Sequence, residues 1–243
     1  MTINRVGAVV HFNSEVDGAL KAGSSFSRIY GEENLIFQTN NPQSFDLLQR
    51  PHKKQVLLAR PYKGPLIEIL NNPELFHVTQ KTDCLINHFM NIKDSLEFLK
   101  TEFVLWFHPD HELVREIPRS KLDLDLEQNI RNRYSQDTRN FFEEVTKHRV
   151  TMKGYGIPSY HRRTALLRVV DFLIESRESI VAPLIEKSDI FVNDDVIMPL
   201  THELLNLKIG NRRLTRELLR KADVILAPRP SIIHHVNIAD KLP

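Results

Sequence analysis

The residues with the clearest capacity for chemistry form the turn Phe107-His108-Pro109-Asp110-His111-Glu112. It follows the unbroken apolar run Phe103-Val104-Leu105-Trp106-Phe107, which is typical of a strand buried on both faces. Imidazole and carboxylate ligands together suit manganese, magnesium, zinc or iron. The turn is therefore either a cation site formed by His108, Asp110 and His111, or a polar turn in which Asp110 caps the next segment.

A second candidate for the same cation is the pair His234-His235 near the end of the chain. Adjacent residues of a strand point to opposite faces, so at most one of the two would reach a shared ion. The alternative is a pair of solvated histidines. The pair becomes a ligand candidate only if this segment packs against the Asp110 turn.

Two charged clusters in the second half could also take part in chemistry. Asp194-Asp195 precedes an apolar pattern of helical period. Both acids could stabilise the start of that helix, or one could cap it while the other acts as a general base. Arg162-Arg163, also at an expected helix start, could bind phosphate oxygens or form surface salt bridges.

The elements that position these residues alternate between strands and helices in the first half of the chain. Strand-helix-strand units predict an α/β fold with a mostly parallel central sheet flanked by helices. Ligands of such sheets collect at the carboxyl ends of the strands. The expected strands cover residues 5–12, 34–38, 55–59, 76–79 and 103–107, and the expected helices cover 14–29, 65–71 and 83–100.

The second half is expected to be more helical and more charged. The simplest organisation is one continuous domain, 1–243, whose second half forms a separate lobe on the sheet. Helices are expected over 122–145, 158–174 and 194–207, with a return to the sheet over 149–155 and a late strand over 223–227.

Composition limits the classes of function. The formal net charge of +2 offers no basic stripe for nucleic acid. Cys84 is the only cysteine, which rules out a disulfide framework or a cysteine zinc site. No signal peptide is recognisable, and no apolar run reaches the ~20 residues of a membrane span. We predict a cytoplasmic protein, with peripheral attachment to the inner face of a membrane as the alternative.

The order of these motifs resembles that of GT-A glycosyltransferases, especially the inverting enzymes of family 2. The family's first strand ends in a Thr-Tyr-Asn-like turn, where this chain has His11-Phe12-Asn13. Its second strand ends in a turn whose acid contacts the nucleotide, where this chain has Asn40.

The later family motifs follow in the same order. The metal motif Asp-x-Asp is matched by His108-Pro109-Asp110, with a histidine in place of the first acid. The Gly-rich segment before Arg-Arg is similar to residues 154–167. The acidic pair that contains the catalytic base is matched by Asp194-Asp195, and the late metal-binding histidine by His234 or His235.

The resemblance implies a GT-A, Rossmann-like fold, with 1–118 binding a nucleotide-diphosphate sugar and 119–243 the acceptor. It implies a UDP-sugar donor, a divalent cation (Mn²⁺ rather than Mg²⁺) and a glycan, lipid or protein acceptor. Asp195 would be the base, with Asp194 as the alternative. Residues near the nucleotide and its phosphates would be His11, Phe12, Asn13, Asn40, Arg162 and Arg163. The cation ligands would be Asp110, His108, His111, His234 and His235.

Three alternatives to a glycosyltransferase are open at this point. A non-catalytic relative would bind a nucleotide diphosphate without turnover, and both Asp194 and Asp195 would face solvent. A metal-dependent phosphoesterase or other hydrolase would gather at least three histidine or acid ligands around an open water position. A structural module would leave the clusters apart.

Overall fold

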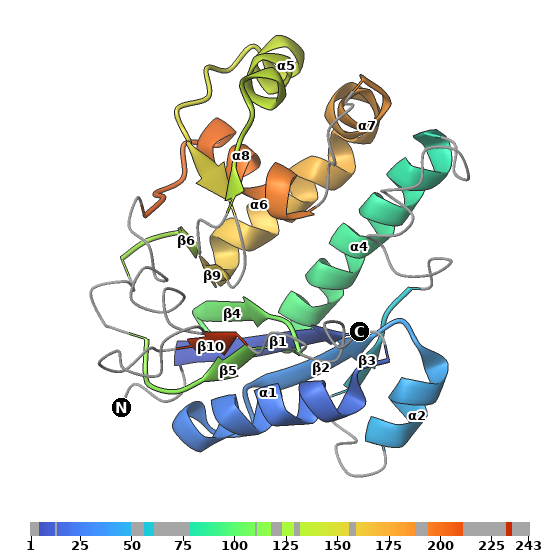
Figure 1. Cartoon of the computed structure of the whole chain (residues 1–243), viewed down its shortest axis with the longest axis vertical. Coiled ribbons are helices and arrows are strands. Elements are labelled where there is room, and N and C mark those ends of the chain that lie inside the picture. The colour runs from blue at the N-terminus through green and yellow to red at the C-terminus, as the bar shows by residue number, and fades with distance from the viewer. Residues whose placement is uncertain are drawn as a thin grey trace, which may run out of the picture.

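A six-stranded sheet in the order β3-β2-β1-β4-β9-β6 runs through the molecule (Figure 1). The structure is a computed structural model that describes residues 5–12, 14–49, 56–60, 78–109, 111–117, 123–128, 132–155, 159–187, 194–210 and 232–234. β1 to β4 are parallel to one another, whereas β9 is antiparallel to both β4 and β6, which confirms the α/β fold with a mostly parallel sheet. The strands of this sheet are β1 (Val6–Phe12), β2 (Leu35–Thr39), β3 (Val56–Leu58), β4 (Phe103–Phe107), β6 (Leu126–Gln128) and β9 (Ser159–Arg162).

The two central strands are apolar on both faces because both faces are covered by helices. Val10 and Phe12 of β1 point toward α1 (Val16–Tyr30), where they pack with Phe26. Val9 of β1 and Trp106 of β4 belong to a second core on the opposite face. Each core contains alternate residues of the strands, as the two-residue period of a strand requires.

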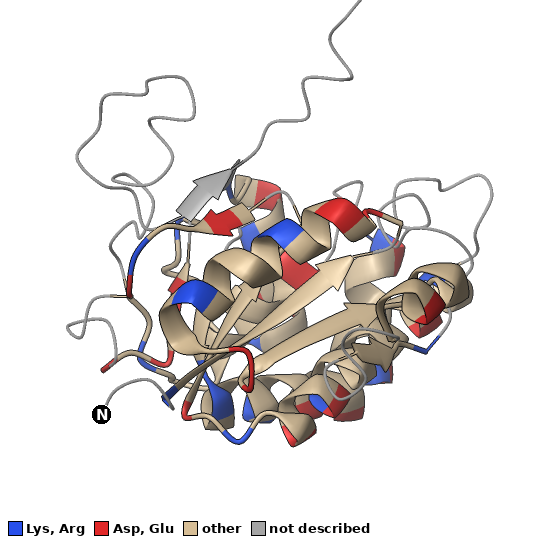
Figure 2. Cartoon of the chain, turned by 90° about the horizontal axis from the view of Figure 1, so that it is seen from below, with Lys and Arg blue, Asp and Glu red and all other residues tan. Residues whose placement is uncertain are grey.

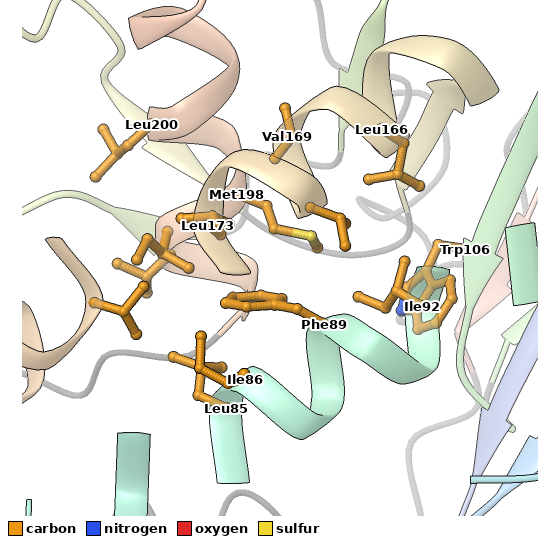
Figure 3. Packing of buried hydrophobic residues seen from close by; sticks show 14 of the residues in the cluster. Leu85, Ile86, Phe89, Ile92, Trp106, Leu166, Val169, Leu173, Met198 and Leu200 are labelled. Atoms are coloured by element: carbon orange, nitrogen blue, oxygen red, sulfur yellow. The ribbon is translucent and has the colours of Figure 1, made fainter. Parts of the chain in front are cut away.

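The second core is larger and lies under α4 (Val78–Phe98), α6 (Arg163–Glu175) and α8 (Asp194–Leu204). Phe89 of α4 contributes to its centre, and Leu173 of α6 and Met198 of α8 surround it (Figure 3). In Figure 1 these three helices lie on one side of the sheet and α1 on the other. The outer helices α5 (Gln136–Thr146) and α7 (Ala182–Lys187) and the π-helix η3 (Arg177–Val181) complete this side.

The segment that follows β4 is fastened along α1. Gly18 makes this possible, because a Cβ at that position would lie 2.9 Å from the carbonyl oxygen of Pro109. Farther along, Ser25 Oγ accepts the backbone N–H of Leu113 at 2.8 Å, and Tyr30 Oη accepts that of Ile117 at 2.7 Å. The turn at the end of β4 is therefore held against α1 by close packing and by hydrogen bonds.

The end of the chain returns to the same turn. β10 (Ile232–His234) pairs antiparallel with β5 (His111–Leu113), and His234 lies directly opposite His111. No local pattern in the sequence signals a pairing of residues as far apart as His111 and His234. The pairing of β10 with β5 brings the end of the chain next to the segment that follows the Asp110 turn, which is the condition set above for a late histidine such as His234 to become a ligand candidate.

Several expected elements differ from the structure. Val78 and Thr79 begin α4 instead of ending a strand. The charged stretch expected as one helix over 122–145 contains β6 and β7 (Asn132–Arg133) before α5. β8 (Gly154–Tyr155) pairs with β7 in a separate two-stranded sheet. His161 and Arg162 lie in β9, so the helix expected from 158 begins only at Arg163.

Helix α2 (Pro42–Gln49) forms in a stretch for which no helix or strand was predicted. Asn41 Oδ1 accepts the backbone N–H groups of Gln43 and Ser44, and Pro42 occupies the first helical position. Asn followed by Pro is a favourable helix start, since the cap satisfies otherwise unpaired donors. The elements expected over 65–71 and 223–227 lie outside the described residues.

Charges of both signs are interspersed over the helices on the side of the molecule seen in Figure 2. Among the described residues of that side no single-sign stripe is visible, which agrees with the near-zero net charge. None of the described helices has the length and hydropathy that a membrane span requires.

Candidate functional site

The candidate site lies at the carboxyl ends of β1, β2 and β4. From β1 the chain continues to β2 and β3 on one side, and β4 then joins β1 on its other side. Ligands of open α/β sheets bind where the strand order reverses in this way. Polar side chains at this edge are therefore candidates for binding.

Four of them form what we call the histidine–aspartate cluster: His11, His88, His108 and Asp194. The ring of His11 stacks on Trp106 (centroids 6.0 Å apart, planes at 18°) and meets the ring of His88 edge-on at 5.2 Å. His88 Nε2 donates to Asp194 Oδ2 at 3.2 Å. His108, at the end of β4, lies close enough for its charge to act on both His11 and Asp194.

The elements aim these side chains at one another. His11 follows Val9 on the face of β1 that turns toward α4, because alternate strand residues share a face. On α4, His88, Asn91 and Ser95 recur at helical spacing on the buried side. Asp194 is the first residue of α8, where the unpaired N–H groups of the first turn favour a negative charge.

The hydrogen bonds around Gln38 define the protonation of His11. Gln38 Nε2 donates to the carbonyl of Asn91 at 2.6 Å and to Ser95 Oγ at 2.7 Å. Its Oε1 therefore faces His11 Nδ1, 3.3 Å away, and can only accept. The proton of the neutral ring is thus on Nδ1, and Nε2 has the lone pair.

Burial, followed by the charges of His88 and His108, lowers the pKa of His11 to about 3. The ring is therefore neutral at pH 7. For Asp194 burial alone would raise the pKa, but the charge and hydrogen bond of His88, with the charges of His108 and His11, lower it overall. The cluster thus combines an ionised, 9% exposed carboxylate with imidazole rings.

Asp195 points into different surroundings from its neighbour. It is half-buried, and its negative charge adds to burial in raising the pKa of both Tyr134 and Tyr155. The rings of the two tyrosines are 4.8 Å apart, and Tyr134 Oη donates to the carbonyl of Val196 at 2.9 Å. The acidic pair therefore connects the histidine–aspartate cluster with an aromatic, partly exposed environment.

Arg60 belongs to the same edge, two residues after β3. Asn91 Oδ1 accepts its backbone N–H at 2.8 Å, and Asn91 Nδ2 donates to its carbonyl at 3.4 Å. Since the carbonyl of Asn91 also holds Gln38, a chain of hydrogen bonds joins Arg60 to His11. The guanidinium is partly exposed and pairs with Asp94 at 3.3 Å.

The structure brings only some of the predicted nucleotide residues to this edge. Asn40 lies there, half-buried, directly after β2. Phe12 points away into the core under α1, so its ring does not face the site. His111 is buried, and its Nδ1 accepts the backbone N–H of His108 at 2.9 Å. Asn13, Asp110 and His235 lie outside the described residues.

Arg162 and Arg163 lie at the amino ends of the parallel strands, away from the candidate site, because Arg162 pairs with Phe103 at the start of β4. Arg162 forms ion pairs with Glu102 at 2.8 Å and with Asp125 at 3.1 Å. Arg163 Nε donates to the carbonyl of Leu96 at 2.7 Å. The structure does not bring these arginines to the carboxyl ends of the parallel strands.

Within the part of the chain that the structure describes, no three His, Cys, Asp or Glu side chains are grouped closely enough to hold a metal ion. Asp110 and His235 fall outside that part. The predicted cation site is therefore untested and stays a prediction.

Sequence reasoning missed His88, Gln38 and Arg60. The available signal for His88 is its spacing with Asn91 and Ser95, which puts three polar groups on the buried face of an amphipathic helix. Gln38 interrupts the apolar run of β2 in a similar way. Nothing local distinguishes Arg60 from a surface arginine.

Comparisons with known proteins identify no family for this chain. No protein-family model and no curated protein matches the sequence. Similar solved structures include the bifunctional IspDF from Campylobacter jejuni, with 11% identity, a TM-score of 0.45 and coverage of 86% of this chain and 49% of that one. The glycosyltransferase GlyE in Streptococcus pneumoniae TIGR4 shows 15% identity, a TM-score of 0.41 and coverage of 96% and 54%.

An active-site mutant of LgtC shows 9% identity, a TM-score of 0.43 and coverage of 94% of this chain and 86% of that one. The chain spans about half the length of the IspDF and GlyE chains. With TM-scores below 0.5, these similarities carry no functional argument, and the family 2 resemblance stays a prediction.

The buried histidines predict a loss of stability in acid. Burial lowers the pKa of His202 to about 4 and that of His11 to about 3, against 6.5 in the unfolded chain. Below pH 6.5 the unfolded state binds more protons than the folded state. The free energy of unfolding therefore decreases as the pH is lowered, by up to about 1.4 kcal/mol per pH unit for each histidine. The lowered pKa of Asp194 extends the fall below pH 4.

Urea unfolding at pH 7, 6 and 5 in EDTA measures this dependence. His202→Asn should reduce the slope, whereas His148→Asn, which changes a half-buried histidine of the α5–β8 connection, should leave it unchanged. Equal free energies of unfolding at pH 7 and 5 in the unsubstituted protein would contradict the expectation.

Proposed function

We propose that this protein is a glycosyltransferase that moves a sugar from a nucleotide-diphosphate sugar, with a UDP-sugar favoured, to an acceptor hydroxyl. One observation carries the proposal. His11, His108 and Asp194, which come from three motifs far apart in the sequence, gather at the carboxyl edge of the parallel strands. A structural module would have no reason to bring them together.

The nucleotide would lie along His11, Asn13 and Asn40 at the ends of β1 and β2. Trp106 stacks on the ring of His11, so this ring would contribute its edge. Arg60, instead of Arg162 or Arg163, would bind phosphate oxygens, since a guanidinium pairs well with phosphate.

The divalent cation would be held by Asp110 and His108, together with His234 or His235. The pairing of β10 with β5 supports this set, because His234 lies opposite His111. Imidazole among the donors suits Mn²⁺ better than Mg²⁺, which prefers oxygen ligands. His111 is a weaker candidate, since its Nδ1 accepts the N–H of His108. A bound cation would stabilise the charge of the leaving diphosphate.

The acidic pair at the start of α8 would serve the acceptor. Asp195 is half-buried beside Tyr134 and Tyr155, and we assign to it the removal of the proton from the attacking hydroxyl. Asp194, held by His88, is the alternative base and orders the first turn of α8. Neither acid is fully exposed, which is unlike the arrangement expected of a non-catalytic relative.

The first test is thermal unfolding with UDP or GDP, with and without Mn²⁺. The unfolding temperature should rise with UDP, and rise further with Mn²⁺, because a ligand that binds the folded state stabilises it. Asp110→Ala should abolish the Mn²⁺-dependent part only, and Asp137→Ala in the exposed first turn of α5 serves as the control. The absence of any shift with either nucleotide would refute the proposal.

The second test is turnover of UDP-glucose, UDP-galactose and UDP-N-acetylglucosamine, followed as released UDP. Asp195→Asn should lower the rate about 10² to 10⁴-fold, the range for a lost general base, without changing UDP affinity. Asp137→Asn removes a comparable helix-start acid and should leave the rate unchanged. An unchanged rate in Asp195→Asn would remove this residue as the base, and Asp194→Asn would then be measured.

The third test compares two arginines at opposite edges of the sheet by calorimetric titration with UDP. Arg60→Gln should weaken binding about tenfold, equivalent to about 1.4 kcal/mol for one charge-assisted phosphate contact. Arg162→Gln should leave UDP affinity unchanged but lower stability, because it breaks the pairs with Glu102 and Asp125. The reverse pattern would restore the assignment made from the sequence.

A further inference from the structure

A second pair of buried histidines lies away from the histidine–aspartate cluster. His161 of β9 and His202 of α8 are 2% and 0% exposed, and their ring centroids are 5.3 Å apart. His161 pairs with Val104, near the start of β4, whereas the candidate site is at the end of that strand. Nothing in the proposed transfer reaction uses these two rings.

One nitrogen of each ring is already engaged. His202 Nδ1 donates to the carbonyl of Met198 at 2.8 Å, so the lone pair of the neutral ring is on Nε2. His161 Nε2 is hydrogen-bonded to Ser159 Oγ at 2.7 Å. The remaining nitrogens are His161 Nδ1 and His202 Nε2.

Within the described residues neither remaining nitrogen has a hydrogen-bond partner, although both are buried. Gln128 Oε1 is in the same condition, while its Nε2 donates to the carbonyl of Gly154 at 3.1 Å. Gln128 pairs with Ser159 across β6 and β9, so its side chain shares a face with those of Ser159 and His161. Three unpaired buried polar atoms on one face indicate a missing partner, because such atoms are nearly always satisfied.

The chemistry of the three atoms indicates a metal ion. Burial holds the pKa of both histidines below the usual range, so the rings are neutral, which is the form that binds metals. A metal-bound histidine almost always donates its other N–H to a carbonyl or a similar acceptor, as His202 does to Met198. The carboxylate of Asp125 acts on His202 and provides nearby negative charge.

We propose that His161 Nδ1 and His202 Nε2 bind Zn²⁺, with Gln128 Oε1 as an oxygen ligand. Two imidazoles on one tetrahedral zinc, at about 2.0 Å each, have ring centroids roughly 5 Å apart. The observed separation of 5.3 Å is close to this value. The ion would join β9 to α8 and thereby fix the helix whose first turn contains Asp194 and Asp195.

Chelator-treated protein, equilibrated with ZnCl₂, tests the proposal through competition with a chromophoric zinc indicator and through ¹⁵N spectra of the histidine rings. We expect a tightly bound Zn²⁺ that strongly shifts the ¹⁵N signals of His161 Nδ1 and His202 Nε2, whether or not the turn after β4 also takes up zinc. His202→Gln should weaken this binding at least tenfold. His148→Gln and His108→Gln should not change it, and the latter separates this site from the proposed Mn²⁺ site.

Two results would overturn the proposal. One is the absence of zinc uptake, with the ring signals of His161 and His202 unchanged. The other is uptake that His202→Gln retains in full but His108→Gln loses, since zinc would then occupy the turn after β4. If His202→Gln does not fold, the ring spectra of the unsubstituted protein decide alone. Nucleotide binding does not enter any of these readouts, so the zinc site can fail or hold independently of the transferase function.

Discussion

The rest of the structure depends on the burial of β1 and β4 on both faces. α1 covers one side of these strands, and α4, α6 and α8 cover the other. Neither face of β1 or β4 is therefore open to solvent, where a polar side chain could be hydrated. Polar groups are consequently concentrated at the carboxyl ends, at His11 and His108. Because the strands are parallel neighbours, those ends lie side by side. Helix α4 from the first half of the chain and α8 from the second half both reach them, through His88 and Asp194.

The pairing of Asp194 with His88 is the electrostatic counterpart of this constraint. A carboxylate that is 9% exposed loses most of its hydration, which is costly unless a partner replaces the water. His88 provides that partner, and the first turn of α8 adds its unpaired N–H groups. The packing of α8 against α4 is thus favoured by two interactions: apolar contacts between the helices, and the hydrogen bond that the buried carboxylate of Asp194 receives from His88.

Features with a local cause could be predicted from the sequence, and those that depend on distant pairing could not. The continuous apolar runs of β1 and β4 identify buried parallel strands, and the apolar period of α8 places Asp194 at its start. By contrast, Arg162 was expected in a helix because it precedes a strong helical pattern, yet its pairing with Phe103 makes it part of β9. Its guanidinium therefore lies away from the carboxyl ends of the parallel strands, whereas Arg60, which no sequence pattern distinguished, lies at those ends. The meeting of His11, His88 and Asp194 requires three elements to pack, and no local pattern encodes that.

The contacts of Pro109, Leu113 and Ile117 with α1 have a consequence for motion. Close packing at Gly18 and the hydrogen bonds to Ser25 and Tyr30 join this segment to the helix at three points along its length. A ligand that rigidifies the turn would therefore slow amide hydrogen exchange in α1, on the face of the sheet that it never touches. Exchange in α1 would thus report a ligand bound at the carboxyl ends of the strands.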